Sequence, residues 1–341
     1  MKKYKRTVFL TVILFLGVFI ICEYGLAQGI WREKIREKIK ERRSQRADGN
    51  REASAGSGER DFSLTYDGLA RTYKAHIPKS YASAAPAALI LAFHGGGGDS
   101  AIMADDKFYN LITKSDKEGF IVAFPNGAGR LKSGKFATWN AGNCCGYARD
   151  NNIDDVGFTR EVIRDLKSRF TIDPERIFAV GMSNGGMFSY RLACDLTGQF
   201  KAIASVAGTD NCADCSSSKP ISILHIHARD DDHVLFNGGA GPEAFKDPAK
   251  VTNFTSVAET VSRWISRNHC AANPERVLDK EGVYCDLYSG CDGNVRVKLC
   301  VTESGGHSWP GGQKASRKKA ADPSTAISAV DEIWEFFKTQ S

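Results

Sequence analysis

Ser183 lies between two glycines in the segment AVGMSNGGMFSYRL (179–192), where an apolar run gives way to helix-forming residues. Glycines on both sides of a serine permit a sharp strand-turn-helix that lifts the hydroxyl clear of a sheet, as a nucleophile requires. The pattern alone does not decide, because glycine makes up 33 of the 341 residues and about 0.25 matches to Gly-x-Ser-x-Gly are expected by chance in a chain of this composition. The role of Ser183 therefore depends on the residues that could act with it.

A serine alcohol is a poor nucleophile without a base, and the chain offers seven histidines for that role. His307 lies in the glycine-rich segment ESGGHSWPGG, directly after the last expected strand, where a side chain can swing over a sheet edge. His225 and His227 instead alternate along an expected core strand. We therefore expect His307 to act as the general base and then as the acid.

The third member of such a site is a carboxylate that holds the imidazole and stabilises its charged form. The segment HIHARDDDH supplies Asp230, Asp231 and Asp232 directly after the strand expected at 221–228. The order serine, aspartate, histidine along the chain is that of the α/β-hydrolases. The residues alone leave the three aspartates as alternatives.

A fourth element is a loop that could stabilise negative charge on a reacting carbonyl oxygen. The segment LAFHGGGGDS (91–100) follows an expected strand, and its glycine backbone can present an N–H group at Gly96. The helix expected after Ser183 directs the N–H of Asn184 at the same point. We expect these two N–H groups to form an oxyanion hole.

The elements that must position these residues alternate between strand-like and helix-like segments, which indicates an α/β fold with a mostly parallel sheet covered on both faces. An antiparallel hairpin around a turn at residues 66–68 is expected to open the domain. The further strands are expected at 87–93, 119–124, 176–181, 201–208, 221–228 and 294–303, and helices at 101–118, 154–170, 184–196, 253–268 and 322–338.

The first 60 residues lack the alternation of strand-like and helix-like segments that follows them. A basic start, an apolar run of 15 residues (8–22) and small residues ending at Ala27 predict a secretory signal at 1–27. The run is shorter than the ~20 residues of a membrane-spanning helix, although an uncleaved anchor is the alternative. Residues 28–60 are expected to be a charged flexible linker, whose segment 31–43 is either an amphipathic helix or a solvated spacer, and residues 61–341 a single catalytic domain.

Charge and cysteine content limit the partners and the compartment. The formal net charge is +6, but residues 1–60 carry about +7, so the remainder is about −1 and nucleic acid is a poor partner. Nine of the ten cysteines follow the apolar run, a density that predicts disulfides in a secreted or periplasmic protein. The pairing stays open, and the odd number leaves at least one thiol unpaired or intermolecular.

Several motifs together resemble those of the polyhydroxybutyrate-depolymerase-like secreted esterases, relatives of the feruloyl and acetylxylan esterases of carbohydrate esterase family one. They are FHGGGGDS, TWNAGNCCG, DDVGF, VGMSNGGMFSYRLAC, HIHARDDDHVLFNGG and GGHSWPGG, and the resemblance spans nearly all of 61–341. It implies an α/β-hydrolase fold, an acyl-enzyme on Ser183 and no cofactor or metal. In that family the acid lies four residues after the strand-end histidine, which selects Asp231, although His227-Ala228-Arg229 stands here for His-Gly-Thr.

The preferred substrates are feruloyl or acetyl esters of plant polysaccharide. Trp139 and Tyr147 offer aromatic faces for a sugar or phenolic ring, and His94, Asn140 and Trp309 are also expected to bind substrate. A polyhydroxyalkanoate oligomer is an alternative substrate. A metal hydrolase built on HIHARDDDH and a non-catalytic envelope or carbohydrate-binding protein on the same fold are the other classes considered.

Overall fold

The computed structural model describes residues 57–131, 134–212, 214–215, 219–244, 252–314 and 321–340. The expected signal (1–27) and most of the expected linker, including the segment 31–43, lie outside the described residues. Residues 56–341 form one compact unit. Among the described residues, no helix has the length and apolar character needed to cross a bilayer.

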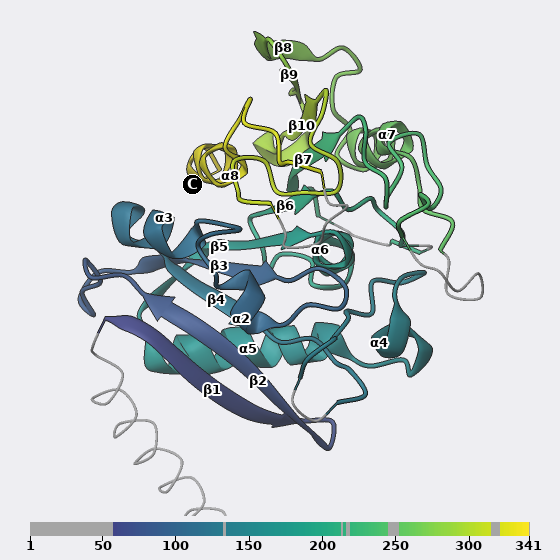
Figure 1. Ribbon diagram of the computed structural model, residues 1–341. Helices are drawn as coiled ribbons and strands as arrows, with labels where there is room; N and C mark the ends of the chain where they lie inside the picture. The colour runs from purple at the N-terminus through teal and green to yellow at the C-terminus, as the bar shows by residue number, and fades with distance from the viewer. Residues whose placement is uncertain are drawn as a thin grey trace, which may run out of the picture. The chain divides into compact units, whose positions relative to one another are not determined.

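The centre of this unit is a ten-stranded sheet with the strand order β1-β2-β4-β3-β5-β6-β7-β10-β9-β8 (Figure 1). The six strands from β4 to β10 in this order are parallel to one another, while β1-β2 at one edge and β9-β8 at the other are antiparallel. The strands are β1 (Gly58–Tyr66), β2 (Leu69–Ile77), β3 (Ala87–Phe93), β4 (Ile121–Pro125), β5 (Ile172–Met182), β6 (Ala202–Val206), β7 (Ser222–Ala228), β8 (Glu275–Lys280), β9 (Val283–Tyr288) and β10 (Val297–Thr302).

Helices cover both faces of the sheet, so the central strands are apolar along their whole length. Every residue of β3, β4, β6 and β7 is buried. One core cluster packs α5, α6 and α7 against the sheet, and a second packs α2, α3 and α8 against the other face. The helices are α2 (Ser100–Met103), α3 (Leu111–Glu118), α4 (Gly146–Asp150), α5 (Asp155–Arg169), α6 (Asn184–Asp195), α7 (Val257–Arg267) and α8 (Ala329–Lys338).

The α/β-hydrolase fold, with a mostly parallel sheet and an N-terminal hairpin, is confirmed by this architecture. Two local features of the structure differ from what the sequence predicts. The helix expected at 101–118 is divided into α2 and α3, because the chain between them turns through Asn110 in the left-handed region (φ 54°). The β8-β9 hairpin was not expected, because most of β8 is exposed and shows no apolar pattern.

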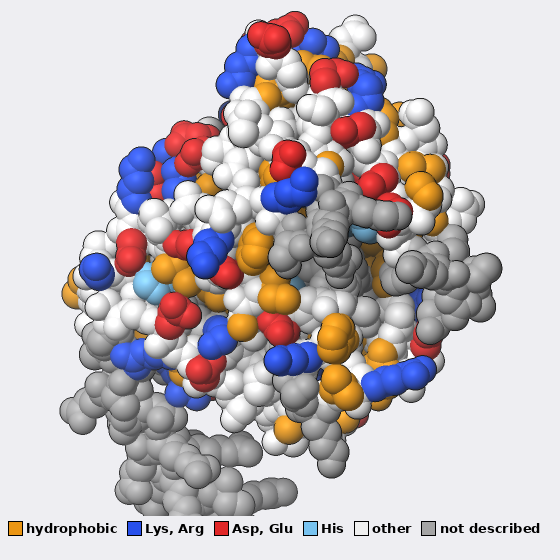
Figure 2. Space-filling view, in the orientation of Figure 1, with side chains coloured by type: hydrophobic (Ala, Val, Ile, Leu, Met, Phe, Trp, Pro, Cys, Tyr) orange, Lys and Arg blue, Asp and Glu red, His pale blue; other side chains and the backbone are white. Residues whose placement is uncertain are grey.

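The cysteines of the described chain form four disulfides: Cys144–Cys145, Cys194–Cys215, Cys270–Cys291 and Cys285–Cys300. Cys212 stays a free, buried thiol, in line with the odd count. On the face in Figure 2, positively and negatively charged side chains are interspersed over the described residues.

Candidate active site

Ser183 is the single residue between β5 and α6, and its backbone is strained, with φ 56° and ψ −123°. The flanking glycines are required by close packing. A Cβ on Gly181 would lie 2.2 Å from the carbonyl carbon of Gly185, and a Cβ on Gly185 would lie 2.1 Å from the carbonyl oxygen of Phe93. The sequence therefore builds a tight strand-turn-helix around Ser183, as the glycine pattern predicts.

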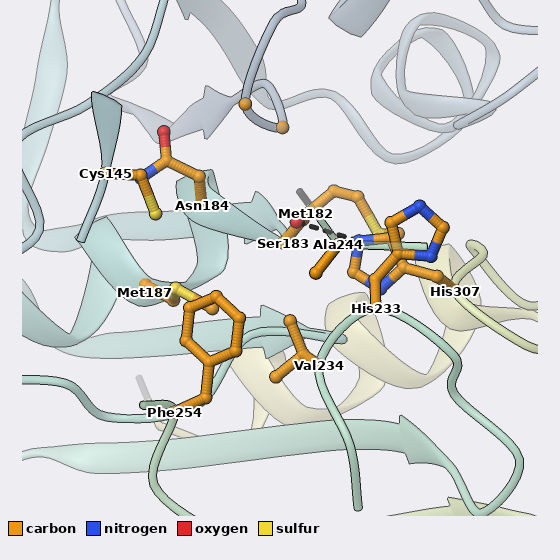
Figure 3. Close-up of a pocket in the computed structure, with 12 residues that line it drawn as sticks. Cys145, Met182, Ser183, Asn184, Met187, His233, Val234, Ala244, Phe254 and His307 are labelled. Atoms are coloured by element: carbon orange, nitrogen blue, oxygen red, sulfur yellow. Dashed lines mark hydrogen bonds between the residues drawn. The ribbon is translucent and has the colours of Figure 1, made fainter. Parts of the chain in front are cut away.

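Three of the expected residues meet at the edge of the sheet where β5, β7 and β10 end. Nε2 of His307 lies 2.8 Å from Oγ of Ser183 (Figure 3). Nδ1 of His307 lies 2.8 Å from Oδ2 of Asp231. Parallel strands bring their carboxyl ends to one edge, which is why residues 183, 231 and 307 converge. Such a line of hydrogen bonds can pass the hydroxyl proton of Ser183 to the imidazole.

The three consecutive aspartates have three different partners. Asp231 reaches Nδ1 of His307, whereas Asp230 accepts the backbone N–H groups of Gly305 (3.3 Å) and Gly306 (2.8 Å). Asp232 lies 2.7 Å from Nδ1 of His233. Of the three alternatives left open by the sequence, the geometry therefore favours Asp231 as the carboxylate that faces His307.

The carboxylate of Asp231 is fully buried and well supplied with donors. Its Oδ1 accepts the backbone N–H groups of His233 (2.8 Å) and Val234 (2.9 Å). Burial alone would raise the pKa of Asp231, but the charge of His307 and hydrogen bonds from His227 and His307 hold that pKa well below its usual range. Asp231 is therefore ionised wherever the protein is folded near neutral pH.

The backbone N–H groups of Gly96 and Asn184 both border the pocket that contains Ser183. Within the described part of the chain, neither N–H has a hydrogen-bond acceptor. The amide side chain of Asn184 is fixed, because its Oδ1 accepts the N–H of Trp139 (2.7 Å) and its Nδ2 donates to the carbonyl of Trp139 (3.0 Å). Two unpaired donors on a rigid backbone are the arrangement that an oxyanion hole needs.

The pocket beside Ser183 has a volume of about 200 Å³ and a largely apolar lining. Figure 3 shows Phe254, Val234 and Met187 on one side of the serine and the two histidines 233 and 307 on the other. The lining residues are Gly95, Gly96, Cys145, Met182, Ser183, Asn184, Met187, His233, Val234, Ala244, Phe254 and His307. Such a pocket can hold an apolar group attached to a reacting carbonyl.

The expectation that Trp139 offers a ring face to substrate is corrected by the structure. Trp139 is 0% exposed, and its indole is stacked on Phe188, while its Nε1–H donates to the carbonyl of His94 (3.0 Å). Trp309 is also buried, with its ring packed against Tyr109. Both tryptophans support the loops around the site and do not face the pocket.

His94 and Asn140 are likewise structural. His94 is fully buried, its Nε2 accepts the N–H of Gly127 (3.0 Å), and burial lowers its pKa to about 4. It is therefore a neutral imidazole that ties the Gly96 loop to the segment after β4. Asn140 is buried and donates to the carbonyl of Ile153 (3.2 Å). Neither side chain lines the pocket, so the expected substrate contacts at these two positions are wrong.

Sequence reasoning missed His233, whose ring lies face to face with that of His307 at 4.5 Å between centroids and 15° between planes. Nitrogen atoms of these two rings and an oxygen of Asp231 lie within 4.8 Å of one another, which is the range of a metal site. The lone pairs of an imidazole lie in the plane of its ring, so two stacked rings cannot both direct a lone pair at one ion. The arrangement is suited to support of His307 and not to metal binding.

The chain has an α/β-hydrolase fold in which Ser183, Asp231 and His307 converge, and comparisons with known proteins agree with this fold. Residues 107–221 match the prolyl oligopeptidase family. The solved acetyl xylan esterase from Aspergillus awamori superposes with a TM-score of 0.53 at 13% identity, covering 82% of this chain and 99% of that one, and shares the fold.

Sequence comparison relates the chain to esterases. It is 32% identical over 195 residues to feruloyl esterase B of Piromyces equi, covering 56% of this chain and 34% of that enzyme. It is 29% identical over 283 residues to the putative esterase NocK of Nocardia uniformis subsp. tsuyamanensis. This match covers 77% of this chain and 79% of NocK. The chain thus spans about a third of the length of the feruloyl esterase it matches, and the predicted resemblance to this group of esterases is confirmed.

Proposed function

We propose that this protein is an esterase that hydrolyses carboxylic esters through an acyl-enzyme on Ser183. The observation that carries the proposal is the line of hydrogen bonds from Ser183 through His307 to Asp231, which opens on a pocket bordered by two unpaired N–H groups. The named esterases among the relatives support the same reaction class.

The geometry supports a two-step mechanism. His307 Nε2 takes the proton of Ser183 while Oγ attacks the ester carbonyl carbon, and the carbonyl oxygen becomes an anion facing the N–H groups of Gly96 and Asn184. The intermediate then expels the alcohol, which leaves with the proton from His307. A water molecule repeats the sequence on the acyl-enzyme, releasing the carboxylic acid and restoring Ser183. Asp231 stabilises the imidazolium in both steps.

Esters of plant polysaccharide are the proposed substrates, since feruloyl esterase is the name of the relative described above. The side chains of Met187, Val234 and Phe254 favour a feruloyl over an acetyl group within this class. An acetyl group has one methyl carbon to bury, whereas a phenolic acyl group can cover the apolar wall with its ring. The disulfides support action outside the cytoplasm, because such bonds persist in oxidising compartments.

The test is a panel of esters offered to the wild-type protein and to Ser183→Ala. The panel contains para-nitrophenyl acetate and butyrate, methyl ferulate, acetylated xylan and a hydroxybutyrate oligomer. We expect the wild type to cleave methyl ferulate fastest and Ser183→Ala to lose at least roughly 10³-fold in kcat on every ester that is cleaved. A folded wild-type protein that cleaves none of them would favour a non-catalytic binding protein on this fold.

A further inference from the structure

A buried chain of hydrogen bonds leads from helix α6 to the carboxylate of Asp231. The hydroxyl of Tyr190 lies 2.8 Å from Nδ1 of His225, and Nε2 of His225 lies 3.1 Å from Nδ1 of His227. Nε2 of His227 lies 2.8 Å from the carbonyl of Val234 and 3.3 Å from Oδ2 of Asp231. Tyr190 and His225 are 0% exposed and His227 is 1% exposed, so this series of hydrogen bonds is shielded from bulk solvent.

The direction of hydrogen-bond donation along this series of residues follows from its first member, Tyr190. Among the described residues, the hydroxyl of Tyr190 has no partner other than His225, so its proton must be donated to Nδ1 of His225. A buried hydroxyl without an acceptor is destabilising, because it has lost its hydrogen bond to water and gained none in the protein. His225 then carries its proton on Nε2 and donates it to Nδ1 of His227.

The direction fixes the charge of the last histidine. Because Nδ1 of His227 accepts a hydrogen bond, His227 is neutral and carries its only ring proton on Nε2. That N–H is shared between the carbonyl of Val234 and the carboxylate of Asp231. The reverse order would require a doubly protonated His227 beside Asp231 and would leave the hydroxyl proton of Tyr190 without an acceptor.

We propose that Tyr190 is a positioning residue that, through His225, holds His227 in its neutral form and so reserves the negative charge of Asp231 for His307. A cationic His227 would form an ion pair with Asp231 and weaken its stabilisation of the imidazolium of His307. The inference rests on the proposed role of Asp231 and His307, and it assigns a role to two buried histidines that the reaction itself does not use.

The surroundings of the chain support this direction. Burial, together with the nearby carboxylate of Asp210, raises the pKa of Tyr190 well above its usual range, so the hydroxyl keeps its proton. Asp210 itself is paired with Arg267 at 2.7 Å. Burial is the largest cause that lowers the pKa of His225 well below its usual range, so this ring stays neutral. Among the described residues, the charged or titratable groups beside this series of hydrogen bonds include Asp210 with Arg267 at its start, and Asp231 with His307 and His233 at its end.

The variant Tyr190→Phe tests the proposal with little change in shape. The ring of Tyr190 is stacked near Trp264 at 5.8 Å, and phenylalanine keeps that contact. Without the hydroxyl, either direction of the chain leaves Nδ1 of His225 unpaired, so the preference for a neutral His227 is lost. We therefore expect the ring proton of His227 to be no longer confined to Nε2.

The measurement is the ¹⁵N spectrum of the histidine rings from pH 5 to 9, with the pH profile of kcat recorded in parallel. In the wild type we expect His225 and His227 to be neutral at pH 7.5 with the proton on Nε2. In Tyr190→Phe we expect a second protonated ring nitrogen on His227 in part of the molecules, and kcat to fall several-fold below the wild-type value with KM unchanged.

Tyr73→Phe is the matched control, because Tyr73 is also fully buried and its hydroxyl is bonded to Asp165 at 2.5 Å, outside the chain. It is expected to leave the ring spectrum and the pH profile as in the wild type. A doubly protonated His227 in the wild type at pH 7.5, or a Tyr190→Phe profile equal to that of the wild type, would overturn the proposal. If Tyr190→Phe does not fold, the wild-type spectrum alone decides the direction. The spectra need no turnover, so this result is independent of the ester panel.

Discussion

His233 shows how a single side chain can support the residues that react. Its ring covers one face of His307, and its Nδ1 is held by Asp232. Burial, and then the nearby His307, lower the pKa of His233, so its ring is neutral at neutral pH. When His307 accepts the proton of Ser183, a neutral aromatic face beside the new cation stabilises it.

The corresponding prediction compares His233→Ala with His233→Phe. Removal of the ring is expected to lower kcat about fivefold, for the loss of about 1 kcal/mol of cation–π stabilisation, while phenylalanine keeps most of the wild-type rate. The two variants are compared at saturating substrate and pH 8. Equal rates for His233→Ala and the wild type would show that the stacked ring does not contribute.

At the scale of elements, the loop after β10 is held in place by a residue that follows β7. Asp230 accepts two successive backbone N–H groups, those of Gly305 and Gly306, just before His307. The positive φ values of Gly305 (133°) and Gly306 (58°) give the loop the curvature that this contact needs. The loop therefore depends on the neighbouring strand for the placement of its histidine.

Asp230→Ala is expected to lower kcat about tenfold by loosening this loop, with little change in the free energy of unfolding, because the carboxylate is exposed. The control is Asp61→Ala, an exposed carboxylate paired with Lys74 on the N-terminal hairpin. Kinetics and urea unfolding are measured for both variants. Wild-type kcat in Asp230→Ala would contradict the proposed role of this contact.

At the scale of the whole molecule, a buried ion pair joins the antiparallel edge of the sheet to the layer of helices beneath it. Arg71 of β2 lies 2.7 Å from Asp155 at the start of α5, and both side chains are at most 5% exposed. The other oxygen of Asp155 accepts the N–H of Asn140 (2.9 Å), so the pair also anchors the loop that leads to the vicinal cysteines.

Arg71→Met is expected to lower the free energy of unfolding by about 3–5 kcal/mol, because it leaves a buried carboxylate without its cation. Lys74→Met on the same strand removes an exposed ion pair and is expected to cost less than about 1 kcal/mol. Urea unfolding of the two variants at pH 7.5 provides the comparison. Similar losses of unfolding free energy in the two variants would mean that the buried ion pair contributes no more to stability than the exposed one.

Much of this organisation follows from local patterns in the sequence. The apolar runs at 87–93 and 221–228 predict β3 and β7 closely, because buried parallel strands are apolar on both faces. The glycines around Ser183 mark the turn because no other residue fits there. The roles of Trp139 and Asp230 could not be predicted, since burial and loop contacts depend on segments far apart in the chain.

The most direct test of the central claim is to identify the residue that reacts with a covalent esterase inhibitor. We would incubate the wild type and His307→Ala with diethyl para-nitrophenyl phosphate and locate the adduct by peptide mass spectrometry. The account predicts one diethylphosphoryl group on Ser183 in the wild type and a much slower reaction in His307→Ala. An adduct on another residue, or no adduct on a folded wild-type protein, would contradict the assignment of Ser183 as the nucleophile.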